Sequence, residues 1–131
     1  MEPTPEALAC TCAHLADERK AEAIVVLNVG KTAFFTDYFV IATGRNERQI
    51  KAIAEQVRLR VKRMDHPLIG TEGSAESGWV LIDLGDVIVH LFNPETRELY
   101  DLELLWGEAP RLPWQDREPL EDAADTGDRV G

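Results

Sequence analysis

The sequence has no apolar run that approaches the roughly 18 residues required for a membrane-spanning helix. Its first six residues include no basic side chain, and no long apolar stretch follows them, so they do not resemble a secretory signal. We therefore expect a cytoplasmic protein without a membrane partner. The 131 residues, 44% of them hydrophobic, suffice for one compact domain with a single core and some remaining tail.

Cysteine is scarce, and the two cysteines lie close together as Cys10 and Cys12. Such a pair does not make a disulfide framework. With His14 they form a Cys-x-Cys-x-His pattern, which is compatible with a metal site. On a helix, however, Cys10 and His14 share one face, whereas Cys12 points nearly the opposite way. We therefore interpret these residues as ordinary helix packing, with no metal or redox cofactor.

Basic residues are also few, at 14 against 24 acidic ones, which makes the net charge −10. Such a chain as a whole repels nucleic acid, because phosphate binding depends on clustered lysine and arginine. The distribution is uneven: residues 45–63 contain seven bases and two acids, and residues 72–108 contain nine acids and one base. The acidic half favours a basic partner. The alternative is that both segments are simply solvated faces.

One helix and two strands are predicted at the start of the chain. Thr4 as a cap, followed by Pro5, predicts a helix over residues 4–19. Two runs rich in β-branched residues predict strands at residues 24–29 and 38–43. The connection between them is short for a parallel crossover, so we expect an antiparallel pair.

The strongest helix signal covers residues 46–64. Asn46 can cap the first turn, and Gln49 three residues later completes the pattern of a capping box. An apolar stripe continues over about four turns, and most of the basic residues lie off that stripe. Pro67 prevents the helix from continuing further.

The second half of the chain predicts more strands. Residues 68–72 are expected to form a short edge strand, and the runs at 79–82 and 87–92 predict a hairpin. Residues 93–96 mark a turn or a single helical turn. Residues 100–106 are expected to form a short helix or an irregular docking segment.

This order of elements predicts an α/β domain with a mixed sheet of about four or five strands and flanking helices. The long helix should cover one face of that sheet. We place the domain at residues 1–107. Residues 108–131 are acidic and contain prolines, so we expect a disordered tail, or a tail partly draped over the surface around Trp114.

One enzyme hypothesis starts from the Gly73–Ser74 loop, which is followed in the sequence by Asp83 and Asp86. This arrangement is similar to that of nucleotidyltransferases, which hold magnesium with paired acids. The two acids are three residues apart across an expected turn, whereas carboxylates on one strand face must be two apart. We therefore favour a structural role in the hairpin and keep a magnesium-dependent nucleotidyltransferase-like enzyme as the alternative. His90 has no recognisable nucleophile motif nearby, so we expect a strand histidine at a surface or interface.

The stronger candidate for function is a cluster of aromatic residues among acids, with Trp79, Tyr100 and Trp106 at its centre. Tryptophan and tyrosine are frequent at binding hot spots, because they bury a large area and keep a polar handle. Neighbouring acids would select a basic partner. The alternative is that the two tryptophans are core residues. A separate hypothesis is an RNA-binding module that uses the basic helix over residues 46–64.

Two signatures resemble the ribosomal silencing factor family, whose plant relative is the iojap protein. The first is Asp-Tyr-Phe-Val-Ile-Ala-Thr-Gly at residues 37–44, followed by Arg-Gln at residues 48–49. The second starts at Glu72 and continues through residues 79–92 and 96–106. Several long motifs in the same order and spacing are far more specific than one short pattern.

The resemblance extends over residues 7–110, and the sequence departs from the family pattern at residues 28–36 and at Leu84. It implies an α/β fold distantly related to nucleotidyltransferases but without their catalytic acids, so neither an enzyme nor a cofactor is expected. It further implies binding to the universal large-subunit ribosomal protein number fourteen, where the small subunit must dock. Bound there, a member blocks subunit joining and represses translation. Homodimers are also implied, and sequence-specific nucleic acid binding is not.

From the cluster and the resemblance together, we expect a non-enzymatic docking surface within residues 79–106. Apolar residues would form its centre, and acids around them would pair with lysine and arginine of the ribosomal protein. The expected partner-binding residues are Trp79, Asp83, Asp86, His90, Tyr100, Leu102, Glu103, Leu105 and Trp106.

Overall fold

The computed structural model describes residues 3–122. The strands are β1 (Glu22–Asn28), β2 (Tyr38–Thr43), β3 (Gly70–Ser74), β4 (Trp79–Asp83) and β5 (Val87–Phe92). The helices are α1 (Pro5–Glu18), α2 (Glu47–Arg63), α3 (Pro94–Tyr100), α4 (Leu102–Leu105) and a 3-10 turn, η1 (Trp114–Asp116). One sheet has the order β1-β2-β5-β4-β3, in which β2 and β5 are parallel and the other neighbours antiparallel. The predicted mixed α/β fold is confirmed.

The two long helices begin where their capping residues predict. The Thr4 hydroxyl accepts a hydrogen bond from the Ala7 N–H at 3.1 Å, and Asn46 Oδ1 accepts one from the Gln49 N–H at 2.9 Å. Gln49 Oε1 in turn accepts from the Arg45 N–H at 2.7 Å, one residue before the position of a regular capping box. Each helix lies within one residue of its predicted bounds.

The predicted strands are also present, and β3 is displaced from its prediction by two residues. Strand β3 pairs with β4 as far as Ser74 opposite Trp79. Gly73 has a positive φ of 77°, and a Cβ atom there would lie 2.0 Å from the Trp79 carbonyl oxygen. The glycine therefore allows the strand to continue past the position where the sequence predicts a loop.

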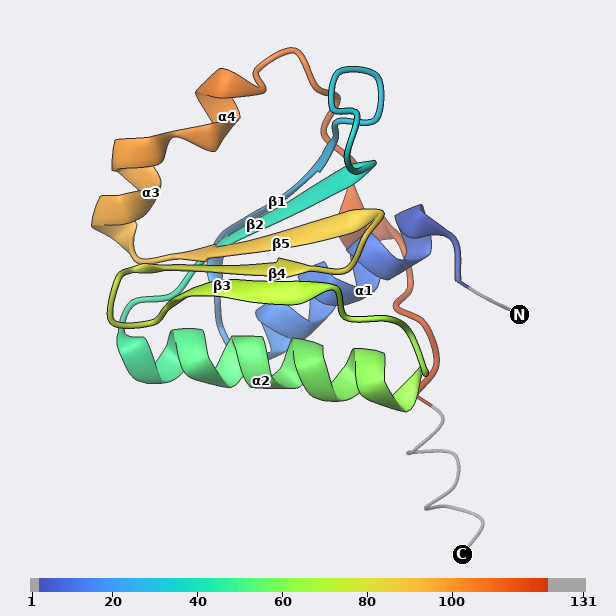
Figure 1. The fold of residues 1–131 in the computed structure, drawn as a ribbon, viewed down its shortest axis with the longest axis horizontal. Helices are drawn as coiled ribbons and strands as arrows, with labels where there is room; N and C mark the ends of the chain where they lie inside the picture. Colours follow the sequence, from blue (N-terminus) through green and yellow to red (C-terminus); the bar gives the residue numbers. More distant parts are fainter. Residues whose placement is uncertain (1–2, 123–131) are drawn as a thin grey trace, which may run out of the picture.

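Helices α1 and α2 cover the same face of the sheet and bury the main core (Figure 1). Fully buried side chains in this layer include Ala9, Val40, Ile50, Ile53, Val57, Ile82 and Leu91. All six residues of β5 are buried. Because this strand lies in the middle of the sheet and is covered on both faces, its sequence is a continuous apolar run without clear alternation.

The opposite face of the sheet is covered only in part. It carries a smaller apolar cluster, against which Leu102 and Trp106 of the α4 segment pack. Figure 1 shows α3 and α4 at one end of the sheet. Strand β4 reflects this difference, because its residues that face the long helices are buried, whereas Trp79, Leu81 and Asp83 are half-buried.

The segment after α4 does not follow the predicted disorder within the described residues. It runs along the outer edge of β1, where the Asn28 N–H donates to the Pro110 carbonyl at 2.8 Å and the Leu112 N–H donates to the Val26 carbonyl at 2.8 Å. These bonds satisfy backbone groups that an open edge strand would offer to another chain. The rest of the predicted tail, residues 123–131, lies outside the described residues.

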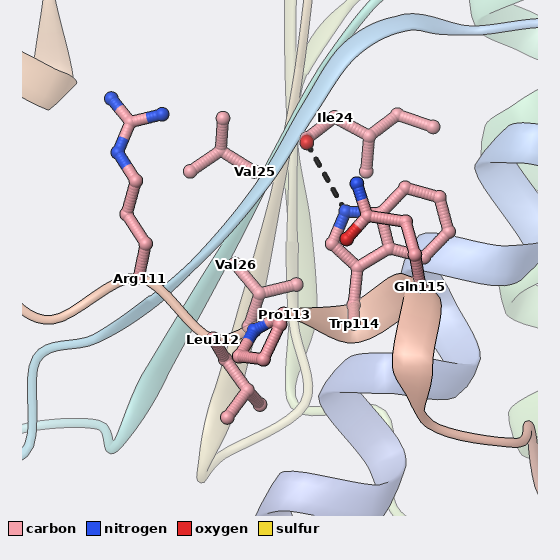
Figure 2. A pocket seen from close by; sticks show the side chains of 8 residues that line it. All are labelled: Ile24, Val25, Val26, Arg111, Leu112, Pro113, Trp114 and Gln115. Carbon is pink, nitrogen blue, oxygen red and sulfur yellow. Dashed lines mark hydrogen bonds between the residues drawn. The ribbon is translucent and has the colours of Figure 1, made fainter.

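Trp114 anchors this strap (residues 108–122), as the alternative of a draped tail predicts. Its ring is buried, and its Nε1–H donates to the Ile24 carbonyl at 3.2 Å (Figure 2). Farther along, the Leu120 N–H donates to Thr11 Oγ1 at 2.9 Å. The predicted boundary after residue 107 therefore does not mark the end of ordered structure, because the strap pairs with β1 and buries its own tryptophan.

Candidate partner-binding surface

Strand β4 and helix α3 line a hollow on the partly covered face of the sheet. It measures about 260 Å³ and is lined by Glu72, Gly73, Ser77, Trp79, Leu81, Thr96 and Tyr100. The Trp79 ring is stacked on Phe92 at 5.1 Å between centroids and lies 4.6 Å from the Tyr100 ring. Tyr100 keeps 51% of its surface exposed. Two predicted aromatic residues therefore meet in one concave, accessible place.

His90, expected at a surface or interface, is buried instead, with 4% of its surface exposed. Its Nδ1 accepts a hydrogen bond from Trp79 Nε1–H at 3.2 Å. An indole nitrogen can only donate, so the imidazole proton lies on Nε2. Burial lowers the pKa of His90 to about 4, which keeps the ring neutral near pH 7. The expected direct contact is corrected: His90 orients Trp79 from below the surface.

Ring contacts continue from His90 towards the other end of the sheet. The Phe39 ring lies 4.7 Å from the His90 ring and 5.3 Å from the Trp106 ring, edge-on in both cases. Phe35 lies 6.5 Å from Trp106. A row of ring side chains therefore crosses this face. This aromatic row consists of Tyr100, Trp79, His90, Phe39, Trp106 and Phe35.

The predicted site omits Phe34 and Phe35, in the loop between β1 and β2. Their exposed fractions are 104% and 62%. Figure 1 shows this loop beside the segment that follows α4, in agreement with the contact between Phe35 and Trp106. The signal was present in the sequence as two adjacent phenylalanines within a mainly polar loop, in a segment that departs from the family pattern. These residues extend the apolar surface beyond residues 79–106.

Helices α3 and α4 present leucines to water. Asp101, with a positive φ of 43°, ends α3 and starts α4 in a new direction. Neither helix has a buried residue. Leu99, Leu104 and Leu105 expose 76%, 77% and 73% of their surface. Leu105 is therefore accessible as predicted, whereas Leu102 is half-buried against the sheet.

The two hairpin acids have different environments. Asp83 Oδ1 accepts a hydrogen bond from the Gly85 N–H at 2.9 Å, and Gly85 has a positive φ of 90°. Asp83 therefore shapes the turn, as the structural interpretation predicts, while Asp86 is exposed. Leu84, a departure from the family pattern, is buried with 2% exposure, so it does not face a partner.

Glu103, expected to pair with a partner's base, is used within the chain. Its carboxylate lies 3.0 Å from Arg97 and 3.4 Å from Arg111 of the strap. Arg97 also donates to Thr43 Oγ1 at 2.8 Å. This network joins α3, α4, β2 and the strap, and the expected contact of Glu103 with a partner stays a prediction. The exposed acids of this half of the chain include Asp86, Glu98, Asp101 and Glu108.

The cysteine pattern near the start of the chain packs inside the domain. Cys10 and Cys12 are each 1% exposed, and burial raises the pKa of Cys12 to about 12. His14 Nε2 lies 3.1 Å from the Trp114 carbonyl oxygen and 2.6 Å from that of Arg117. These positions confirm the helix-packing interpretation. Across residues 3–122, no group of His, Cys, Asp and Glu is arranged to hold a metal ion, and no helix could span a membrane.

Comparison with known proteins adds independent findings. The chain matches the family described as ribosomal silencing factor during starvation over residues 2–130. A ribosomal silencing factor of Halalkalibacterium halodurans is 42% identical over 96 residues, which cover 73% of this chain and 82% of the relative. A Mus musculus protein named mitochondrial assembly of ribosomal large subunit protein 1 is 35% identical over 92 residues, 68% of this chain and 40% of that protein. A crystal structure from Chromobacterium violaceum, 32% identical, has a TM-score of 0.77 over 80% of this chain and 88% of its own.

Proposed function

The chain belongs to the ribosomal silencing factor family, and from that membership we propose that it binds the large ribosomal subunit and blocks joining of the small subunit, which represses translation. The proposed partner is the universal large-subunit ribosomal protein number fourteen. We also propose that the protein is cytoplasmic, non-enzymatic and able to form homodimers. The Mus musculus relative is named for assembly of the ribosomal large subunit, which supports the choice of subunit.

The apolar surface on the partly covered face of the sheet carries this proposal. Leu104 and Leu105 expose 77% and 73% of their surface, and Phe34 is fully exposed at 104%. Grouped apolar residues in contact with water mark interaction sites on soluble proteins. Trp79 and Tyr100 line the hollow beside them, and these residue types carry much of the energy at binding hot spots.

The charge around this surface is suited to a basic partner. The acids Asp86, Glu98 and Asp101 are exposed. The bases of the region are Arg97 and Arg111, which are paired with Glu103, and the exposed Lys31 of the loop between β1 and β2. The exposed charge is therefore mainly negative, which speeds encounter with a lysine- and arginine-rich protein. Ribosomal proteins are rich in those residues because they bind RNA phosphates.

The proposed mechanism is steric and requires no chemistry. A compact chain of this length has a radius of gyration of about 14 Å. A body of that size on the joining face of the large subunit prevents close approach of the small subunit. The rigid core beneath the surface supports this mechanism, because a docked domain must keep its shape to exclude a second body.

Sucrose-gradient sedimentation with purified subunits tests the proposal. The protein should migrate with the large subunit and reduce the joined-ribosome peak. Truncation of a central hot-spot aromatic costs about 2 kcal/mol, roughly 30-fold in affinity. We expect losses of that order for Trp79→Ala and Tyr100→Ala, and none for the control Leu59→Ala on α2. Normal folding with unchanged binding in both aromatic variants would show that this surface is not the interface.

The nucleotidyltransferase alternative has its own test. It requires magnesium-dependent nucleotide binding that Asp83→Asn and Asp86→Asn abolish. Calorimetry with ATP and magnesium should give no binding heat, because Asp83 is engaged with the Gly85 N–H in the hairpin turn.

A further inference from the structure

Two of the six basic residues of α2 hold the strap. Arg60 donates to the Leu120 carbonyl, and Arg63 lies 2.8 Å from Asp122, so both hold the strap. Arg60 is also buried, with 7% exposure. These two bases serve the fold, whereas Arg48, Lys51, Arg58 and Lys62 are exposed.

Three of these exposed bases line a groove between α2 and the edge strand β3, which run beside each other in Figure 1. The groove measures about 590 Å³, and its charged lining residues are Arg48, Lys51, Glu55 and Arg58. Arg58 pairs with Glu55 at 2.9 Å on the surface, where such a pair is weak and readily exchanged. Arg48 and Lys51 are exposed.

A second hollow continues this groove past the start of α2. It measures about 680 Å³ and shares Arg48 and Ala52 with the first. Its other charged lining residues are Glu18, Arg19, Lys20 and Arg45. The two hollows form one basic track with six bases and two acids (bases Arg19, Lys20, Arg45, Arg48, Lys51 and Arg58). Arg45 also pairs with Glu22 at 2.7 Å on the surface. In a chain of net charge −10, that excess of bases is a strong local reversal of sign.

The chemistry of the track identifies its ligand. Arg48 and Arg58 are ten residues apart on α2, which corresponds to roughly 15 Å along a helix. A row of bases of that length matches successive phosphates of a nucleic acid backbone better than one small anion. No aromatic residue lines either hollow, so base stacking, by which single strands are held, is not provided.

We infer that the basic track binds the phosphate backbone of double-stranded RNA without reading its sequence. The track and the aromatic row lie on different sides of β3, and Gly73 lines both the groove and the aromatic hollow. The two surfaces therefore adjoin at β3. The inference does not depend on the proposed function, because it follows from the charge and shape of α2 and β3.

Fluorescence anisotropy with a labelled RNA duplex of about 16 base pairs tests the inference. The full chain should bind two duplexes of unrelated sequence equally. Its affinity should fall steeply between 50 and 200 mM salt, with a log–log slope of about −3 for three to four phosphate contacts. The double variant Arg48→Glu/Lys51→Glu should bind at least tenfold more weakly and reduce the slope by about two.

A matched control variant distinguishes RNA binding by the track from a general effect of net charge. Lys31→Glu makes the same change in charge as the single variant Lys51→Glu, at an exposed residue outside both the track and α2, and its RNA affinity should stay within about twofold of wild type. An equal loss in Lys31→Glu and Lys51→Glu, or no duplex binding by wild type at 50 mM salt, would overturn the inference. So would displacement of RNA by poly-glutamate at equal charge, because the track would then bind acidic protein. Trp79→Ala should keep full RNA affinity, which distinguishes this test from that of the proposed function.

Discussion

On the sheet face covered by α1 and α2, Ile50, Ile53 and Val57 have no exposed surface, whereas on the other face Leu105 is 73% exposed. Both faces are built from the same five strands. One is closed by two long helices, and the other carries two short helices without a buried residue. The apolar residues of the covered face stabilise the fold, whereas the exposed apolar residues of the other face are available to a partner.

The same division occurs within single strands. Val80 and Ile82 of β4 are buried beneath the long helices, while their neighbours Trp79 and Leu81 remain half-buried on the other side. Because successive side chains of a strand point to opposite faces, one segment serves both purposes. Substitutions on the covered side should therefore change the free energy of unfolding, and substitutions on the other side should change the affinity for a partner.

The largest expected effect is on the covered face. Ile53→Ala removes a fully buried side chain and should lower the free energy of unfolding by about 3 kcal/mol, because the surrounding core cannot close the cavity. Urea denaturation measures the loss. Leu105→Ala is the matched control and should change stability by less than about 0.5 kcal/mol. Comparable losses in both variants would remove the distinction between the two faces.

The second effect concerns the residue beneath the partly covered face. The pKa of His90 falls from 6.5 to about 4 on folding, so between these values the unfolded chain binds a proton that the folded chain excludes. The stability contributed by the neutral ring is present above pH 6.5 and is lost as the pH falls towards 4. We expect a loss of about 2 kcal/mol between pH 7 and pH 5 from this group alone.

The variant His90→Asn isolates this contribution, because it cannot titrate and keeps an oxygen that can accept from Trp79 Nε1–H. Urea unfolding at pH 7 and pH 5 should show a smaller pH-dependent loss for the variant than for wild type. An identical loss in both proteins would assign the pH dependence to other groups.

The smallest expected effect on stability belongs to Phe34, which contacts water over its whole surface. Phe34→Ser should leave the free energy of unfolding within about 0.5 kcal/mol of wild type. Its affinity for large subunits should fall by about tenfold, because an exposed aromatic anchor is lost. Cosedimentation measures the change, with Leu68→Ser as a control at another exposed apolar position. Unchanged binding would confine the interface to residues 79–106.

Much of the fold was predictable because its signals are local. The caps Thr4 and Asn46 mark the starts of the long helices. Runs of β-branched residues mark the strands, and the short connection between the first two predicts their antiparallel pairing. The aromatic residues of the site were predictable by type, since tryptophan and tyrosine among acids are typical of binding surfaces. Phe34 and Phe35 were not predicted, because they lie outside both the acidic half of the chain and the two signatures.

The sequence by itself determined the helices, the strands, the family and the acidic, aromatic character of one half of the chain. Only the tertiary structure decided the roles of individual side chains within that half. His90 is buried beneath Trp79, Glu103 is paired with Arg97 and Arg111, and the strap is ordered along β1. The physical reason is distance along the chain: a cap or a strand run is set by neighbouring residues, whereas burial and ion pairing depend on residues that only folding brings together.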